Sequence, residues 1–523
     1  MYSIPIINKL LTDPLLLALL EDNKDLESFH NGMNWKNIDE EFLEKRELSI
    51  ENRKLLVDSL LAQYEKSNIT PPKQIHRLLN KGVFTVTTGH QLCLFGGPQF
   101  FIHKIVSILK LVQDLKSKFS KYDFVPLFWM ASEDHDFEEI SGVEVFGNNI
   151  KISGKHDKAV GRINSIIFHS ALLDLENLLS KDQRSSSILN LFKRSFNEQT
   201  WASATRYWIH ELFKDYGLVI LDADQVELKE SFIPIMEKEI KEEFVSKNVS
   251  STNDLLANLN YKARISPRRI NLFYLSEMKR SRIILNDSGS FKIGERLIEK
   301  EELIAELLNN PECFSPNVLL RPIYQEFILP NVIYVGGPSE ISYWAQLKNA
   351  FDCVDVLFPV LQLRDHFSWI DSKSIQWWLK QGYELSDLIN PIDQIIRKGF
   401  VENNEFELNN EKEQFHALKN SFLKKVIDLN PSMEKTALAS FKRMENEIQK
   451  LENRLLKEFK LKNEQQISKA YRIQRKLLVK GTLNERVESF IGPYLNCQKD
   501  LLDELFANSN VLDPNLKILL LDA

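Results

Sequence analysis

The chain has 523 residues, of which 43% are hydrophobic and 27% charged, and its formal net charge is −6. This length suggests about three domains, and the composition excludes a disordered or collagen-like chain. The negative charge argues against a protein whose main role is to bind nucleic acid. No apolar run approaches the ~18 residues that span a bilayer, and the four scattered cysteines form no CxxC pair. We therefore expect a cytoplasmic, multidomain protein with neither a membrane nor a nucleic-acid partner.

Residues 1–70 are predicted to form an acidic, mostly helical segment, and a strand–helix–strand pattern follows it. Residues 83–88 are a β-branched run typical of a buried strand, and residues 124–131 are a second apolar run. Between them, apolar residues recur every three or four positions over 101–115, which predicts a helix. Pro126 cannot donate to a ladder, so we expect it at the start of its strand or on an unpaired side. This order is typical of a βαβ unit and hence of a parallel sheet.

The strand pattern returns later in the chain. Further strands are predicted at 218–221, 332–335 and 356–363, with a helix over 341–351 between the last two. Two stretches, about 141–205 and about 240–315, carry turn signals between short β-prone runs. We interpret them as connective segments inserted into an α/β core that spans residues 71–371.

Residues 372–523 are predicted to form a helical domain, because the sequence there becomes charged and poor in glycine. Five apolar residues recur at the a and d positions of successive heptads: Phe441, Met444, Ile448, Leu451 and Leu455. This spacing is typical of a coiled coil, and one helix of an intramolecular bundle is the alternative. Pro431 separates it from an earlier amphipathic stretch over 415–429, so we expect antiparallel helices.

Two glycine-bearing turns follow predicted strands of the core. The residues of the first turn that could meet a ligand are Gly89, His90, Gln91, Gly96 and Gly97, and those of the second are Gly336, Gly337 and Glu340. Lys104 lies two turns into the helix that follows the first turn, where it could reach a phosphate or carboxylate. Turns at the carboxyl ends of parallel strands form the crevice in which open α/β sheets bind ligands. Neither turn matches a Walker loop or a dinucleotide fingerprint, and an ordinary helix start is the alternative.

An acidic run, Glu133 to Asp136 with His135 inside it, follows the strand at 124–131. These residue types could bind a metal, but consecutive residues of an extended chain point to opposite sides, so one ion could use only some of them. We favour a polar site that holds an amine or a ribose, in which a carboxylate takes the proton of an ammonium nucleophile. A solvated acidic turn is the alternative.

A few further residues have side chains that could serve either a site or the structure. Arg364 follows the strand at 356–363 and could clamp a carboxylate or phosphate, or form a surface salt bridge. Asp222 and Asp224 follow the strand at 218–221, where they could be either turn residues or site residues. Arg268 and its neighbour are interpreted as a solvated face. Cys93 is not expected to be a nucleophile, because no nearby pattern requires a thiolate.

These motifs together resemble the cysteine ligase family of bacillithiol biosynthesis (the BshC family). The segments that carry the resemblance are 88–104, 128–136, 216–228, 315–322, 324–326, 336–340 and 343–344, and the similarity covers almost the whole chain. It implies a nucleotidyltransferase-like Rossmann core, an inserted connective domain and a C-terminal coiled coil that forms a homodimer. At 478–486 the chain departs from the family's pattern, and we predict no site residue there.

The resemblance implies addition of cysteine to glucosaminyl-malate, which gives the thiol bacillithiol. The carboxylate of cysteine must be activated before an amine can attack it, so we expect ATP with Mg²⁺ as co-substrate and no tightly bound cofactor. The alternatives are a non-catalytic dimeric protein that binds a nucleotide or thiol precursor, and a transferase that uses a pre-activated cysteinyl donor.

One site is predicted from the residues and the resemblance together. Its candidate catalytic residues are His90, Glu133, Asp134 and Asp136. Its candidate substrate- or nucleotide-binding residues are Gly89, Gln91, Gly96, Gly97, Lys104, His135, Gly336, Gly337, Glu340, Tyr343 and Arg364. No metal-ligand set is predicted.

Overall fold

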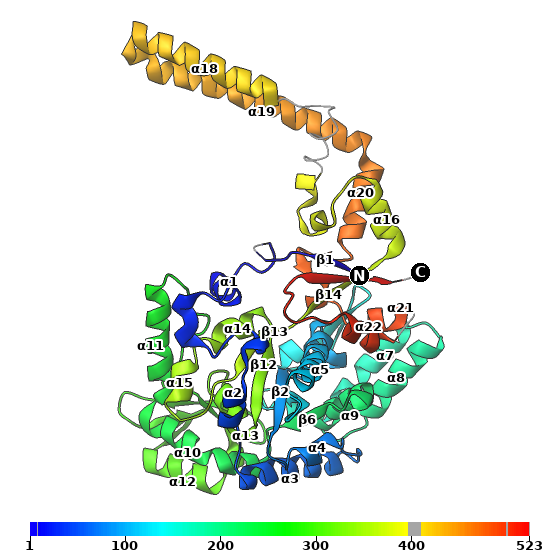
Figure 1. Cartoon of the computed structure of the whole chain (residues 1–523), viewed down its shortest axis with the longest axis vertical. Coiled ribbons are helices and arrows are strands. Elements are labelled where there is room, and N and C mark those ends of the chain that lie inside the picture. The colour runs from blue at the N-terminus through cyan, green and yellow to red at the C-terminus, as the bar shows by residue number, and fades with distance from the viewer. Residues whose placement is uncertain (8, 396–408, 498–499, 522–523) are drawn as a thin grey trace. The chain divides into compact units, whose positions relative to one another are not determined.

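The computed structural model describes residues 1–7, 9–395, 409–497 and 500–521 of the chain (Figure 1). The chain forms two compact units. The first comprises Met1–Trp369 and Thr482–Asp522, and the second comprises Ile370–Gly481. Residues 1–70 are therefore part of the first unit, and so is the segment that begins at Thr482, which the sequence predicts to lie in the helical domain.

The first unit is built on a five-stranded parallel sheet. Its strands, in spatial order, are β13 (Val360–Leu363), β12 (Asn331–Gly336), β2 (Val83–His90), β3 (Asp123–Met130) and β6 (Val219–Asp222). These strands are almost continuously buried, which explains why they read as apolar, β-branched runs rather than alternating ones. The parallel core predicted from the sequence is confirmed, although only the last four residues of the predicted strand at 356–363 form β13.

Pro126 lies inside β3 without disrupting the sheet. β3 pairs with β2 from Asp123 onwards, whereas its pairing with β6 begins only at Leu127. One side of Pro126 therefore lacks a strand partner, as expected for a residue that cannot donate a hydrogen bond. Helix α5 (Phe100–Lys118) connects β2 to β3 and packs against both, which completes the predicted βαβ unit.

Helices and short connections surround this sheet (Figure 1). The other helices of the first unit are α1 (Pro14–Leu20), α2 (Glu40–Lys45), α3 (Ile50–Lys66), α4 (Gln74–Arg77), α6 (Phe137–Ile140), α7 (His169–Leu178), α8 (Gln183–Ser195), α9 (Trp201–Phe213), α10 (Val226–Glu242), α11 (Phe244–Asn258), α12 (Lys300–Asn309), α13 (Arg321–Ile328), α14 (Pro338–Trp344), α15 (Lys348–Asp352), α21 (Ile491–Asn496) and α22 (Leu501–Asn508). The single helix predicted over 341–351 is thus two helices, α14 and α15.

Both predicted insertions contain the expected short strands. The first holds the hairpin β4 (Gly142–Val145) and β5 (Asn148–Lys151). The second holds an antiparallel sheet with the spatial order β10 (Arg296–Ile298), β9 (Phe291–Ile293), β8 (Arg280–Leu285), β7 (Leu272–Leu275) and β11 (Phe314–Pro316). The turn signal around Gly289 lies between β8 and β9.

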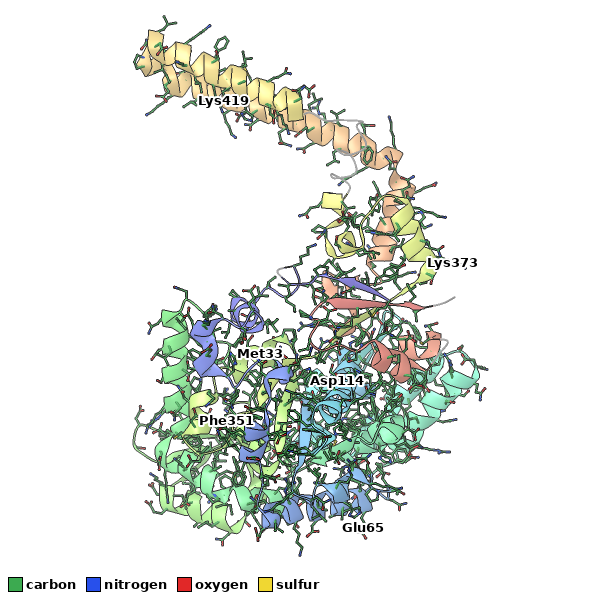
Figure 2. The ribbon with its side chains drawn as sticks, in the orientation of Figure 1. Met33, Glu65, Asp114, Phe351, Lys373 and Lys419 are labelled. Atoms are coloured by element: carbon green, nitrogen blue, oxygen red, sulfur yellow. The ribbon has the colours of Figure 1, made fainter. Side chains whose placement is uncertain are left out.

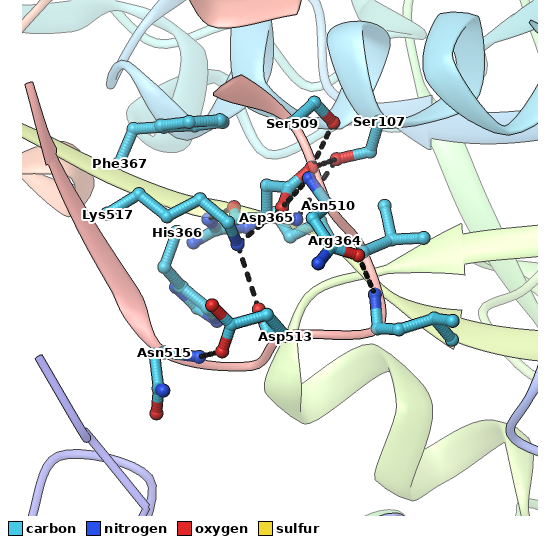
Figure 3. Close-up of polar contacts among 12 residues, drawn as sticks. Ser107, Arg364, Asp365, His366, Phe367, Ser509, Asn510, Asp513, Asn515 and Lys517 are labelled. Atoms are coloured by element: carbon cyan, nitrogen blue, oxygen red, sulfur yellow. Dashed lines mark hydrogen bonds and ion pairs between the residues drawn. The ribbon is translucent and has the colours of Figure 1, made fainter. Parts of the chain in front are cut away.

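The two ends of the chain meet in a small third sheet, in which β17 (Leu516–Leu521) lies between β1 (Tyr2–Ile4) and β14 (His366–Asp371). A buried ion pair fixes this C-terminal segment: Lys517 Nζ lies 2.7 Å from Asp365 Oδ1. Asp365 also accepts hydrogen bonds from Ser107, Ser509 and the backbone N–H of Asn510 (Figure 3). These contacts explain why the segment that begins at Thr482 belongs to the first unit.

The second unit is helical and comprises α16 (Ser372–Lys380), α18 (Asn409–Leu429), α19 (Glu434–Lys462) and α20 (Glu464–Gln474). A turn at Pro431–Met433 joins α18 to α19, which pack against each other as the predicted hairpin. The ring of Phe441 lies 6.0 Å from that of Phe415, and Lys419 Nζ lies 2.7 Å from Glu445 Oε1. Figure 2 shows side chains, that of Lys419 among them, projecting from both helices.

The two apolar rows of α19 have different surroundings. Phe441 begins the a row and contacts α18, and the next two residues of that row, Ile448 and Leu455, are half-buried. The d row stays exposed, since Met444 is 51% and Leu451 is 54% accessible. Among the described residues, no helix is both long and apolar enough to cross a bilayer.

Candidate functional site

A cavity of about 600 Å³ lies at the carboxyl edge of the parallel sheet. It is lined by residues that directly follow β2, β3, β12 and β13. The chain runs outward from β2 through β3 to β6 and then crosses to β12 on the other side, so the direction of winding reverses between β2 and β12. Open α/β sheets bind ligands at such a point. The cavity therefore lies where the two glycine turns led us to expect it.

Most of the predicted site residues line this cavity. Those that do are Gly89, His90, Gln91, Lys104, Asp134, His135, Gly337, Glu340, Tyr343 and Arg364. Those that lie outside its lining are Gly96, Gly97, Glu133, Asp136 and Gly336.

Structural contacts account for the carboxylates outside the cavity. Glu133 is buried and lies 2.7 Å from Lys229 Nζ, which also pairs with Asp224 at 2.8 Å. Asp136 is exposed, and its carboxylate caps α6 by accepting a hydrogen bond from the N–H of Glu139. Only the two middle residues of the run, Asp134 and His135, line the cavity. Residues 132–133 form a turn, so the strict alternation expected of an extended chain is not observed. Among the residues described, no group of three or more His, Cys, Asp or Glu side chains could hold a metal ion.

The glycines outside the cavity are needed for packing and chain reversal. Gly97 has φ +65°, and a Cβ atom there would lie 2.7 Å from Cβ of Cys93. Gly96 has φ +81° and faces the rings of Trp208 and Phe490. Both residues adopt left-handed conformations that disfavour side chains. They shape the start of α5 and do not contact the cavity, in contrast to the role predicted for them.

Asp134 lies in the cavity wall within a network of donors. Gln91 Nε2 donates to its carboxylate at 2.6 Å, and Arg280 Nη1 donates at 3.3 Å. Burial raises the pKa of Asp134, but the hydrogen bond from His135 and the charges of Arg321 and Arg280 outweigh it and hold the pKa well below its usual range. A carboxylate that resists protonation is a weak base. Asp134 is therefore better suited to orient a positively charged or hydrogen-bonding group than to accept a proton.

Lys104 joins the two predicted turns. Its Nζ donates to the carbonyl of Gly89 at 2.9 Å and lies 2.5 Å from Oε2 of Glu340. Glu340 in turn accepts a hydrogen bond from the N–H of Gly337 at 2.6 Å. Burial lowers the pKa of Lys104, although the charge of Glu340 opposes this effect. Lys104 is thus already paired, and it ties the end of β2 to the end of β12.

His90 presents a neutral ring to the cavity. Burial and the charges of Lys104 and Arg364 lower the pKa of His90 well below its usual value. Its ring packs at 5.0 Å from that of Phe100. A neutral imidazole can donate or accept one hydrogen bond on its free nitrogen, which makes His90 a polar contact for a ligand.

Five residues that line the cavity have a buried polar atom with no hydrogen-bond partner among the described residues. These atoms are His90 Nε2, Gln91 Oε1, Arg321 Nε, Trp344 Nε1 and Arg364 Nε. Buried polar atoms in proteins are nearly always paired. These five residues leave hydrogen-bonding capacity unmet in the cavity wall, which favours a polar ligand over an apolar one.

Sequence reasoning missed a wall of positive charge. The additional arginines that line the cavity are Arg268, Arg280, Arg282, Arg321 and Arg486. Arg268, which the sequence predicts on a solvated face, is exposed and also lines the cavity. Arg280 is buried, with its guanidinium 3.9 Å above the ring of Phe273. Arg280 and Arg282 are two apart on β8 and so share one face, which is the signal that could have identified them.

Arg364 does not form the surface salt bridge that the sequence leaves open as the alternative. It is buried, and both of its terminal nitrogens contact the carboxylate of Glu485. Arg486, the next residue, lines the cavity. The segment at 482–486, for which no role was predicted, therefore contributes to the site.

The comparisons with known proteins agree with this architecture. Residues 3–365 match the family model "Bacillithiol biosynthesis BshC, N-terminal Rossmann-like domain", and residues 368–521 match "Bacillithiol biosynthesis BshC, C-terminal coiled-coil domain". The chain belongs to the BshC family. The predicted Rossmann-like core and C-terminal coiled coil are thereby confirmed.

Relatives in the family match over most of their length. A protein of Flavobacterium johnsoniae is 33% identical over 97% of both chains, and one of Christiangramia forsetii is 33% identical over 97% of this chain and 96% of its own. A protein of Flavobacterium psychrophilum is 36% identical over 87% of this chain and 86% of its own. Each is named "Putative cysteine ligase BshC".

The Lys104–Glu340 pair gives a test of how this BshC-family site is held together. We expect Lys104→Met to lower the free energy of unfolding by about 2 kcal/mol, because it removes the buried partner of Glu340, whose carboxylate is 27% exposed and keeps the hydrogen bond from the N–H of Gly337. Lys110→Met is the matched control on the same helix. Lys110 pairs with Asp114 near the surface, so the loss there should stay below about 1 kcal/mol. Urea unfolding followed by tryptophan fluorescence measures both, and equal losses would contradict the assignment.

Proposed function

We propose that the protein joins the carboxyl group of cysteine to the amine of glucosaminyl-malate and so completes bacillithiol. The observation that carries the proposal is one cavity lined both by arginines and by carboxylates that follow β3 and β12. Glucosaminyl-malate has carboxylates and an amine, and cysteine has one of each. Arginine forks bind carboxylates, and carboxylates bind ammonium groups. Membership of the BshC family supports the same reaction.

We further propose ATP, with its Mg²⁺, as the second substrate. A carboxylate is a poor electrophile, so an oxygen of the cysteine carboxylate would first attack the α-phosphorus of ATP, forming an acyl adenylate and releasing pyrophosphate. The sugar amine would then attack the acyl carbon, forming the C–N bond as AMP leaves. The arginine wall provides the positive charge that phosphates require. Attack at the γ-phosphorus, with an acyl phosphate and ADP, is the other route to the same amide.

Glu139 replaces Asp134 as the proposed proton acceptor for the attacking amine. Glu139 lines the cavity, and its Oε2 lies 3.5 Å from Gln91 Nε2. Burial raises the pKa of Glu139, and the negative charges of Asp134, Asp136 and Glu340 raise it further. A carboxylate with a raised pKa is a better base near neutral pH than one with a depressed pKa.

An assay with purified protein tests the proposal. We expect incubation with cysteine, glucosaminyl-malate and ATP to give bacillithiol and AMP, both measured by mass spectrometry. Release of ADP instead would assign the acyl phosphate route. Product formed from a pre-activated cysteinyl donor without ATP would indicate a transferase, and ligand binding without any product would indicate a binding protein.

Three carboxylates in one short stretch should respond differently to removal of their charge. We expect Asp134→Asn to lower kcat/KM about tenfold or more, since it removes a charged acceptor from the cavity wall. Glu139→Gln should lower kcat with little change in KM, because it removes the base. Asp136→Asn is the control and should have a much smaller effect than either, since Asp136 does not line the cavity, caps α6 and is only one of the charges that raise the pKa of Glu139. Steady-state kinetics separate the three, and a large effect of Asp136→Asn would contradict the assignment.

We also propose that the α18–α19 hairpin forms a homodimer with a second copy of the chain. The d row of α19 leaves Met444 and Leu451 exposed, and Leu418 and Phe422 on α18 are exposed as well. Exposed apolar rows on a helical hairpin are typical of helices that pack against a partner. In the a row, Phe441 contacts α18 within the chain, and Ile448 and Leu455 are half-buried. We therefore propose the exposed d row as the dimer seam, in place of Ile448 and Leu455.

The double variant Met444→Lys/Leu451→Lys should convert the dimer to a monomer while the helical circular dichroism stays unchanged, because two charges would have to be buried in the seam. Asn446→Lys/Asn453→Lys adds the same charge on another face of α19 and should leave the dimer intact. Sedimentation velocity measures both. A dimer that survives the first substitution places the interface elsewhere.

A further inference from the structure

Glu485 is the centre of a buried polar cluster beside the cavity. Its Oε1 accepts hydrogen bonds from Arg364 Nη2 at 2.7 Å and from His366 Nδ1 at 2.8 Å. Its Oε2 accepts from Arg364 Nη1 at 3.0 Å, from His103 Nδ1 at 3.0 Å and from the N–H of Phe367 at 3.2 Å. The side chain is completely inaccessible to solvent. Both carboxylate oxygens are therefore fully used inside the protein.

The two histidines of the cluster are neutral donors. Burial lowers the pKa of His103 and of His366, even though the charge of Glu485 opposes it. Each ring faces a carboxylate oxygen with Nδ1, and an ionised carboxylate only accepts, so Nδ1 carries the proton in both rings. The charge balance of the cluster is thus one carboxylate against one guanidinium, that of Arg364.

The arrangement leaves one donor of Arg364 free. Its two terminal nitrogens bond to Glu485 and to the carbonyl of Asp365. Its Nε has no partner among the described residues and lies 4.0 Å from the position that a Cβ of Gly337 would occupy. Arg364 and Gly337 both line the cavity. The guanidinium is therefore held by Glu485 and Asp365, and its remaining N–H lies beside the turn at Gly337, which borders the cavity.

We propose that Glu485 is a positioning residue for substrate recognition: it fixes Arg364 so that Nε can donate to an anionic oxygen of the ligand. This inference rests on the proposed function for the presence of substrate in the cavity. The oxygen belongs to a carboxylate or to a phosphate, because a guanidinium binds both. The sequence departs from the family pattern near residue 485, and Arg364 and Glu485 are 121 residues apart. The sequence alone therefore does not predict their contact.

The neighbouring residue Asp365 provides a matched control. Like Glu485, it is a fully buried carboxylate that binds a buried cation, Lys517, and ties the C-terminal segment to the core (Figure 3). Unlike Arg364, neither Asp365 nor Lys517 lines the cavity. Asp365 therefore shows what is lost when a buried carboxylate with a purely structural role is removed.

The test measures anion binding by isothermal titration calorimetry at low ionic strength, with L-malate for the carboxylate and inorganic phosphate for the phosphate. We expect Glu485→Gln to weaken the binding of one of the two anions about tenfold or more, because the amide would no longer hold both terminal nitrogens of Arg364. The anion that is affected identifies the group that Arg364 recognises. Asp365→Asn should lower the melting temperature but leave both dissociation constants unchanged.

A second variant keeps the test decisive if Glu485→Gln folds poorly. Arg364→Lys retains the positive charge but has no Nε donor and no fork, so it should weaken the same anion. The double variant should bind no more weakly than Arg364→Lys alone, because the two residues act as one unit. The proposal is overturned if wild type binds neither anion, if both anions are weakened equally, or if Asp365→Asn has the same effect as Glu485→Gln. These readouts need no turnover, so they distinguish failure of this inference from failure of the proposed ligase reaction.

Discussion

The buried contact between Lys104 and Glu340 is the interaction around which the site is organised. It joins the turn after β2 to the turn after β12, the two strands between which the winding of the sheet reverses. At that point the carboxyl ends of parallel strands diverge, and the chain must span the gap with loops whose polar backbone groups need partners. One lysine satisfies the carbonyl of Gly89 and the carboxylate of Glu340 together.

Charge is divided unequally across this crevice. The ends of the parallel strands contribute Asp134 and Glu340, while the inserted antiparallel sheet contributes arginines on β8. Asp134 is held ionised by this positive wall, as the direction of its pKa change reflects. A ligand with both an amine and carboxylates can match both sides at once, which a phosphate alone or an amine alone cannot. The insertion therefore supplies much of the chemical character of a cavity whose position is set by the core.

The C-terminal segment closes the same region from a third direction. Two adjacent residues each form a buried ion pair with this segment: Arg364 pairs with Glu485, and Asp365 pairs with Lys517. Breaking either buried pair would leave an uncompensated charge, which costs about 3–5 kcal/mol. This cost explains why residues after Gly481 remain with the first unit although the helical unit interrupts the chain before them.

The parallel core, the inserted segments and the helical hairpin could all be predicted from the sequence. These features follow from local patterns: runs of apolar residues for strands buried on both faces, spacings of three and four for helices, and a proline between two amphipathic stretches. The same local reasoning located the cavity, because parallel strands end at one edge. It also foresaw that only some of the residues from Glu133 to Asp136 could meet a ligand. Which residues do so depends on Lys229, which lies far along the chain.

The side chains that complete the site are brought together by the tertiary fold. Arg280 comes from the insertion, and Glu485 follows the helical unit in the sequence. No local sequence pattern relates either residue to the turn after β2. The tertiary fold also decides that Lys104 is paired and that Gly96 and Gly97 serve packing. The physical reason is that burial and charge pairing depend on neighbours distant in sequence. A local pattern can predict where a chain turns, but the protonation and the partners of a side chain follow from everything packed around it.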